Sequence, residues 1–106
     1  MVKRGEIWVI NLDPTVGSEI QKTRPCVIVS PADLHDHLRT VIVAPMTSMG
    51  FAAPFRVPVT HDGKKGLIVL DQLRSVDQSR LVRKAGSLPA KTLDEVLLRL
   101  QEIFAR

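Results

Sequence analysis

The stretch GEIWVINLDPTVGSEIQKTRPCVIVS, residues 5–30, decides the fold because two hydrophobic runs flank one polar connection. The runs at 7–12 and 26–29 are rich in β-branched residues, which predicts two strands. The second run, extended to 25–30, is apolar almost throughout and predicts a central strand buried on both faces. Loops on such a scaffold often carry functional groups, and this connection contains Glu19, Lys22 and Arg24.

Proline and glycine divide the chain up to residue 89 into short pieces, which favours further short strands. We expect these strands at 40–44, 55–60, 66–70, 73–76 and 81–85. Pro45 is expected to end the first of them, and Pro58 to confine the second to an edge or bulge position. The dipeptide Asp62-Gly63 suits a tight turn between the second and the third, because such a turn needs positive φ.

Two helices are expected, a short one at 32–38 and a longer one near the C-terminus. Ser30 is the candidate cap of the first. The second has apolar residues at helical spacing opposite a charged face, which is typical of an amphipathic helix packed on a sheet. Its start is open between a capping box of Thr92 with Glu95 and an earlier start at Pro89. The pattern predicts a mainly β fold with α (α+β), a small barrel or bent antiparallel sheet with these two helices.

Length and charge bound the classes of function. We expect one domain over residues 1–106. The net charge of +4 and the pI near 9.7 favour a polyanionic partner, RNA or DNA. The single cysteine, Cys26, cannot form an internal disulfide, and its apolar surroundings predict an inert thiol in a reducing cytoplasm. No apolar run is long enough to span a membrane, and the first residues do not read as a signal peptide.

Five segments resemble the PemK/MazF family of toxin endoribonucleases, in the order that this family shows. They are RGEIW at 4–8, NLDPTVGSE at 11–19, TRPCVIVS at 23–30, PMTS at 45–48 and DQLRSVDQSRL at 71–81. The resemblance implies an SH3-like barrel assembled as a homodimer. It also implies the toxin of a type II toxin–antitoxin system, which cleaves single-stranded RNA (mRNA) at specific sequences without a metal. The implied products carry 2′,3′-cyclic phosphate and 5′-hydroxyl ends, and the implied antitoxin has an acidic, partly disordered tail.

Arg24 and Thr47 are the first candidates for catalysis. Arg24 precedes Pro25, which restricts its backbone to an extended conformation, and a guanidinium can hold a phosphodiester through two parallel hydrogen bonds. The alternative is an ordinary surface arginine at the start of a strand. Thr47 follows the strand at 40–44, where a hydroxyl either reaches a phosphate or closes a turn. The resemblance aligns Arg24 with the family's catalytic arginine, Thr47 with its active-site threonine and Ser48 with a neighbouring phosphate contact.

Glu19 and Asp71 are the candidates for proton transfer, because the resemblance implies that the matching carboxylates contribute to activity in some members of the family. The alternatives are a solvated loop glutamate and a strand-end aspartate that satisfies backbone donors. Ser18 stands where several relatives have histidine, so a histidine acid or base is not available there. The further RNA contacts that we predict are Ser18, Lys22, Ser48, Phe51 and Phe55, with Phe51 the better candidate for stacking on a base.

We expect no metal and no cofactor, since His35 and His37 have no further ligands nearby in sequence and His61 is remote from them. Arg74 is expected to pair with Asp71 or Asp77 in a structural role. Two other functions stay open: a toxin of the same fold that poisons DNA gyrase, and a non-catalytic RNA-binding module with an SH3-like fold. The TRP and PMTS segments favour the nuclease.

Overall fold

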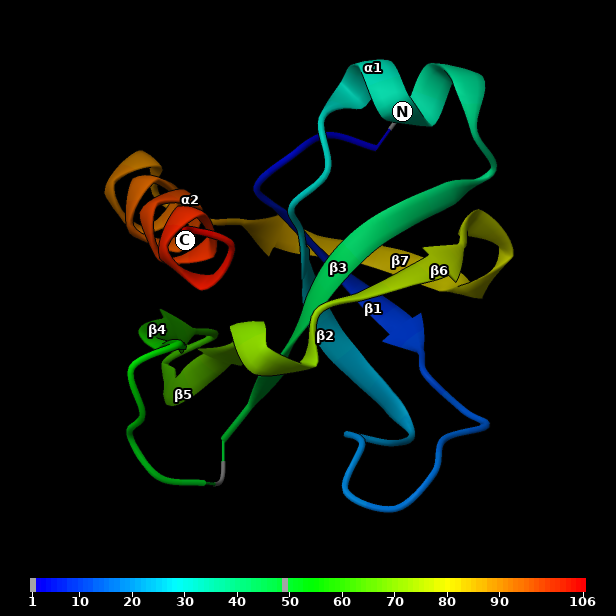
Figure 1. Cartoon of the computed structure of the whole chain (residues 1–106). Helices are drawn as coiled ribbons and strands as arrows, with labels where there is room; N and C mark the ends of the chain where they lie inside the picture. The colour runs from blue at the N-terminus through cyan, green and yellow to red at the C-terminus, as the bar shows by residue number, and fades with distance from the viewer. Residues whose placement is uncertain (1, 49) are drawn as a thin grey trace.

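The computed structural model describes residues 2–48 and 50–106, which form a curled antiparallel sheet flanked by two α-helices (Figure 1). The strands are β1 (Glu6–Asn11), β2 (Thr23–Ile28), β3 (Thr40–Thr47), β4 (Arg56–His61), β5 (Lys64–Val69), β6 (Arg74–Asp77) and β7 (Leu81–Ser87). The helices are α1 (Ala32–His37) and α2 (Ala90–Ile103), and two 3₁₀ turns are η1 (Leu70–Gln72) and η2 (Gln78–Arg80). This architecture confirms the predicted fold class, although several boundaries differ by one or two residues.

The sheet curls because β3 pairs with different strands along its length. The strand order is β4-β5-β3-β2-β1-β7, with β6 also paired to β3. Residues 40–43 of β3 pair with β6, and Met46 and Thr47 pair with β5. The prediction that Pro45 ends this strand was wrong. Pro45 lies between the residues of β3 that pair with β6 and those that pair with β5. Along this edge of β3 no hydrogen-bond donor is therefore required from Pro45.

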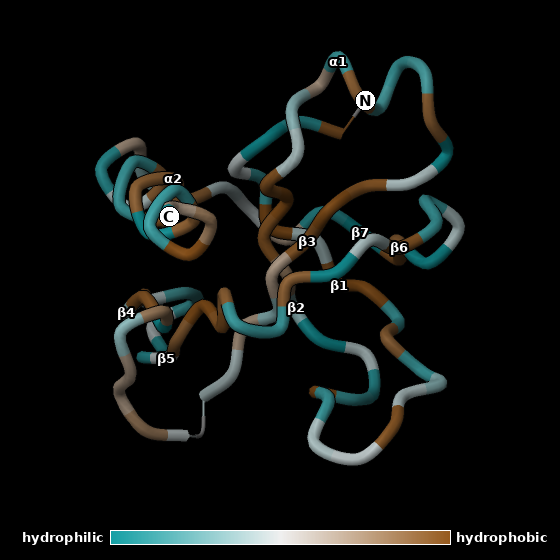
Figure 2. Tube along the Cα trace, in the orientation of Figure 1, coloured by the Kyte–Doolittle hydropathy of each residue, from teal (hydrophilic) through white to brown (hydrophobic). Residues whose placement is uncertain are grey.

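Each face of the sheet covers a hydrophobic cluster, and β2 contributes to both. Val27 packs in a cluster with Ile7 and with Val96 of α2, whereas Cys26 and Ile28 pack in a second cluster with Ile10. These side chains are at most 2% exposed, and each contributes about 1.5–3 kcal/mol where a large apolar group is fully buried. The prediction of a strand buried on both faces is confirmed, and Figure 2 shows the hydrophobic residues gathered in the central strands.

The two helix starts differ from the capping predictions. Pro89 is the N-cap of α2, so the earlier of the two candidate starts is correct and Thr92 lies inside the helix. Ser30 does not cap α1. Its buried hydroxyl accepts a hydrogen bond from the Ile42 amide at 2.9 Å and lies 2.6 Å from His35 Nε2. The hydroxyl therefore satisfies a strand amide and a buried imidazole instead of a helix end.

The predicted turns are present. Asp62 and Gly63 have φ of 52° and 73° and connect β4 to β5, as the Asp-Gly pair predicts. Pro58 lies in β4 at an edge of the sheet, which is also as expected. The Asp77 carboxylate accepts from the Ser79 amide at 2.8 Å and caps η2. Within the described residues, neither α-helix is long and apolar enough to cross a membrane.

Candidate active site

β2 and β3 bring Arg24 and Thr47 together from positions far apart in the sequence. The two strands are antiparallel, with Cys26 opposite Pro45. Arg24 and Thr47 lie two residues beyond this pair, just past the last paired residues of the two strands. Both residues, with Ser48, line one hollow of about 280 Å³. Three of the predicted site residues therefore share one surface.

This hollow, which we call the cationic groove, has apolar lining residues, which we call its floor, and polar, charged or glycine lining residues, which we call its rim. Its floor consists of Val9, Pro25, Met46, Val59 and Ala85. Its rim contains Arg24, Thr47, Ser48, His61, Asp62, Lys64, Lys65, Gly66 and Arg83. The rim has four Lys and Arg side chains against the single carboxylate of Asp62, which lies 3.5 Å from His61 Nε2. A hollow lined by one sign of charge attracts a polyanion.

The sequence reasoning missed Lys64, Lys65 and Arg83. The pair Lys64-Lys65 is visible as a basic step in the β4–β5 hairpin, but nothing in the sequence places it near Arg24. Arg83 belongs to β7, which reaches the groove because it pairs with β1.

One nitrogen of the Arg24 guanidinium, Nε, already makes a hydrogen bond within the protein. Its Nε donates to the Gln21 carbonyl at 3.1 Å. The remaining donors are on the two terminal nitrogens, where a guanidinium matches two phosphate oxygens. No carboxylate of residues 2–48 and 50–106 pairs with Arg24.

Thr47 is positioned by a close approach of β5. A Cβ atom added at Gly66 would lie 2.7 Å from the Thr47 carbonyl oxygen, so only glycine fits at this point. The contact holds the end of β3 against β5 and fixes the backbone from which the Thr47 side chain extends.

Glu19 and Asp71 line a second hollow, of about 210 Å³, rather than the cationic groove. Leu12, Ile20, Pro45, Gln72, Leu73 and Arg74 complete its lining. On β3 the division falls between two neighbouring residues, because Pro45 lines the second hollow whereas Met46 and Thr47 line the groove. The structure therefore separates the four predicted catalytic residues into two pairs.

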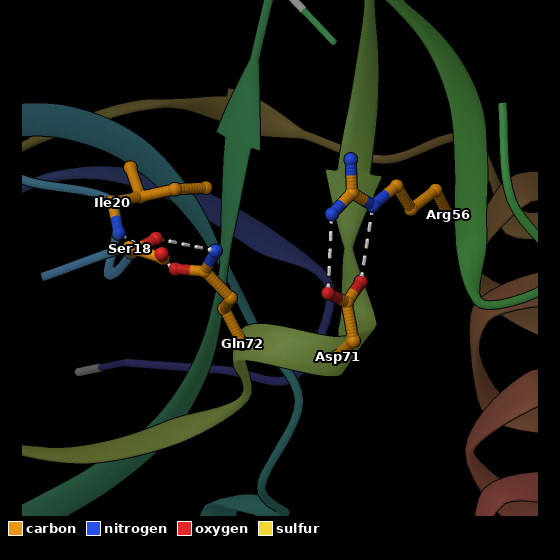
Figure 3. Close-up of polar contacts among 5 residues, drawn as sticks. All are labelled: Ser18, Ile20, Arg56, Asp71 and Gln72. Carbon is orange, nitrogen blue, oxygen red and sulfur yellow. Dashed lines mark hydrogen bonds and ion pairs between the residues drawn. The ribbon is translucent and has the colours of Figure 1, made fainter. Parts of the chain in front are cut away.

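Both carboxylates of the second hollow already have hydrogen-bond donors. Glu19 Oε1 accepts a hydrogen bond from the Val16 amide at 2.6 Å, within its own loop. Asp71 accepts from Arg56 Nε and Nη2, each at 3.2 Å, in a bidentate ion pair (Figure 3). Hydrogen bonding to Asp71 raises the pKa of Arg56. Asp71 thus pairs with a guanidinium instead of satisfying backbone donors.

The other predicted RNA contacts lie on loops. Ser18 and Lys22 are exposed in the β1–β2 connection, where Lys22 has a φ of 71° and its amide donates to Asp13 Oδ1 at 3.0 Å. Phe51 is 73% exposed, and the Arg56 guanidinium carbon lies 5.0 Å from its ring centroid. Phe55 instead packs against the hydrophobic cluster of Val27, a placement that disfavours it as a base contact.

Arg74 and Cys26 also bear on the site. Arg74 donates to the Leu12 carbonyl at 3.1 Å, so the predicted pairing with Asp71 or Asp77 was wrong. Burial raises the pKa of the Cys26 thiol to about 12, although Arg74 and Arg24 act in the opposite direction. Among the described residues, no group of three or more His, Cys, Asp or Glu side chains is arranged to hold a metal ion.

The fold and the site define a class of small, mainly β proteins in which an arginine and a threonine line one cationic groove on a curled sheet. Comparison with known proteins specifies the class. The chain belongs to the PemK-like, MazF-like toxins of type II toxin–antitoxin systems, whose family pattern matches residues 3–104. Family membership confirms the resemblance found in the sequence.

Three relatives illustrate the match. Endoribonuclease PemK of Escherichia coli is 40% identical over 109 residues, covering 97% of this chain and 82% of that protein. The crystal structure of MazF from Deinococcus radiodurans has a TM-score of 0.85 at 29% identity and covers 96% of this chain and 94% of its own. A MazE–MazF crystal structure from the same organism has a TM-score of 0.79 at 25% identity and covers 98% and 95%.

Proposed function

We propose that this chain is a sequence-specific endoribonuclease that cleaves single-stranded RNA, the toxin of a type II toxin–antitoxin pair. The observation that carries the proposal is that Arg24 and Thr47 line the same cationic groove. Membership of the toxin family and the name of the Escherichia coli relative support it.

The proposed reaction is an intramolecular transesterification. The ribose 2′-oxygen attacks the adjacent phosphorus, a new P–O2′ bond forms and the P–O5′ bond breaks. The 2′-hydroxyl proton passes to a base and the departing 5′-oxygen receives a proton, which leaves 2′,3′-cyclic phosphate and 5′-hydroxyl ends. The RNA supplies its own nucleophile, so the chemistry needs geometry, charge stabilisation and proton transfer but no metal-activated water.

Arg24 and Thr47 have separate roles in this reaction. The terminal nitrogens of Arg24 donate to the non-bridging phosphate oxygens as negative charge develops on them. The Thr47 hydroxyl orients the phosphate or the ribose for in-line attack, and Ser48 contacts the neighbouring phosphate.

Glu19 and Asp71 line the second hollow rather than the groove, and of these two carboxylates Glu19 is the better candidate for proton transfer. Both Asp71 oxygens accept hydrogen bonds from Arg56, whereas the described bond to Glu19 involves Oε1. Arg56 therefore competes with any proton for the Asp71 carboxylate. This leaves Asp71 better suited to positioning than to acting as a base.

Single-stranded RNA suits the groove because an unpaired backbone can adopt the in-line geometry and its bases can be read individually. The phosphates would follow the basic rim, with Lys22 and Ser18 contacting RNA from the β1–β2 loop. The exposed ring of Phe51 would stack on a base.

The proposed assembly is a cytoplasmic homodimer that is inhibited by an antitoxin. The relative in Deinococcus radiodurans was crystallised as MazE–MazF, which supports an antitoxin partner. An acidic, disordered antitoxin tail would compete with RNA for the same basic rim.

The test is cleavage of a long unstructured RNA in EDTA, with fragment ends identified by mass spectrometry. Arg24→Ala removes the guanidinium, Arg24→Lys keeps the charge but loses the paired donors, and Arg106→Ala is the charge-matched control at an exposed position. We expect discrete cuts with cyclic-phosphate ends from the wild type and the control, and at least about a hundredfold less cleavage from Arg24→Ala. Absence of cleavage by the folded wild type would overturn the proposal and favour gyrase or non-catalytic RNA binding as the activity.

A further inference from the structure

The 3₁₀ turn η1 contacts both the β1–β2 loop and the start of β4. Figure 3 shows its consecutive side chains Gln72 beside Ser18 and Ile20 and Asp71 beside Arg56. Gln72 reaches the β1–β2 loop, and Asp71 reaches Arg56 at the start of β4. One short turn therefore binds two segments that are distant in sequence.

Gln72 holds the backbone on both sides of Glu19. Its Oε1 accepts from the Ile20 amide at 2.6 Å, and its Nε2 donates to the Ser18 carbonyl at 3.2 Å. Ser18 and Ile20 are the immediate neighbours of Glu19 in the chain. The Gln72 side chain thus uses its acceptor and one of its donors to restrict the backbone around Glu19, which lines the second hollow.

Asp71 reaches the loop between β3 and β4 through Arg56. The bidentate ion pair fixes the guanidinium, which is also 5.0 Å from the centre of the Phe51 ring. The Arg56 side chain is only 18% exposed, while the Phe51 residue is 73% exposed. A cation held in this way steadies one face of an otherwise exposed aromatic ring.

We propose that η1 is a brace that sets the position of the β1–β2 loop before RNA binds, with Gln72 as the positioning residue for Glu19. The effect on cleavage rests on the proposed endoribonuclease function. The effect on loop order does not, because the hydrogen bonds exist in the protein without RNA.

The test compares Gln72→Met, which keeps the length of the side chain but loses both hydrogen bonds, with Gln78→Met. Gln78 lies in η2, is similarly half-buried, and its Nε2 donates to the Leu38 carbonyl at 3.2 Å. It therefore controls for the loss of a glutamine side-chain hydrogen bond outside the site. The measurements are amide hydrogen exchange at Ile20 without RNA, melting temperature, and kcat and KM for RNA cleavage.

We expect the hydrogen-exchange rate of the Ile20 amide to be about fivefold to tenfold higher in Gln72→Met than in the wild type, and to be unchanged in Gln78→Met. We expect kcat to fall about tenfold to a hundredfold in Gln72→Met, with a smaller change in KM and a melting temperature like that of the control. Equal Ile20 exchange in all three proteins would overturn the brace, as would a kcat loss no larger than the control's. If the wild type does not cleave RNA, the proposed function fails and Ile20 exchange alone decides the brace.

Discussion

Gly66→Ala is expected to impair cleavage strongly although it removes no polar group. The added Cβ would lie 2.7 Å from the Thr47 carbonyl oxygen, whereas a carbon–oxygen contact normally spans about 3.3–3.6 Å. The ends of β3 and β5 must then separate by about 0.6 Å or more. Overpacking of this kind costs about 1–3 kcal/mol of unfolding free energy, and misplacing a positioning group by about 1 Å can lower kcat by about a hundredfold.

The matched control is Gly5→Ala, whose Cβ would lie 2.9 Å from Leu93 Cδ2 and whose φ of +90° strains any other residue. Both variants lose stability, but only Gly66→Ala displaces Thr47. Thermal unfolding and RNA cleavage per folded molecule separate the two effects, because about 1 kcal/mol corresponds to about 4–8 °C in a domain of this size. If Gly66→Ala retains its kcat, or if both variants lose kcat equally, Thr47 is not positioned by β5 as described.

Three further outcomes follow from contacts outside the Arg24–Thr47 pair. Arg56→Met and Asp71→Ala should each lower kcat. The double variant should have a kcat no lower than either single variant, because both substitutions break the same ion pair. Additive losses of kcat would assign Asp71 a role independent of Arg56. Burial alone would raise the pKa of Glu6, but hydrogen bonds from Lys84 and other donors lower it below 4.5. The ionised Glu6 carboxylate therefore contributes fully to stability above this pH, and the contribution is lost as the pH falls through the lowered pKa. Glu6→Gln should flatten that part of the curve of unfolding free energy against pH. An unchanged curve would contradict the assignment. Cys26, with its pKa raised to about 12, should react with a thiol reagent only on unfolding, and fast labelling of the native protein would refute its burial.

Local sequence was sufficient to predict the elements whose pattern is decided by near neighbours. The apolar run around Val27 predicted the central strand, and the Asp62-Gly63 pair predicted the hairpin turn. Both signals lie within a few adjacent residues, where periodicity and turn chemistry act. The grouping of Arg24 with Thr47 came instead from the family resemblance, and both residues line the cationic groove.

The parts that could not be predicted depend on contacts between distant segments. Pro45 reads locally as the end of a strand, and only the change of partner along β3 explains why the strand continues. Gln72 is an ordinary polar residue until the β1–β2 loop comes to lie against it. Arg83 reaches the groove only through the pairing of β7 with β1.

The most direct test of the proposed mechanism replaces one ribose in the substrate. After a cleavage site has been mapped, the same RNA is prepared with a 2′-deoxynucleotide immediately 5′ to the scissile phosphate and incubated with the wild-type protein in EDTA. The mechanism predicts cleavage of the all-ribose RNA, with cyclic-phosphate ends, and no cleavage at the substituted position. Cutting of the 2′-deoxy substrate at that position would show that water or another nucleophile attacks the phosphate, and would contradict the reaction assigned to Arg24 and Thr47.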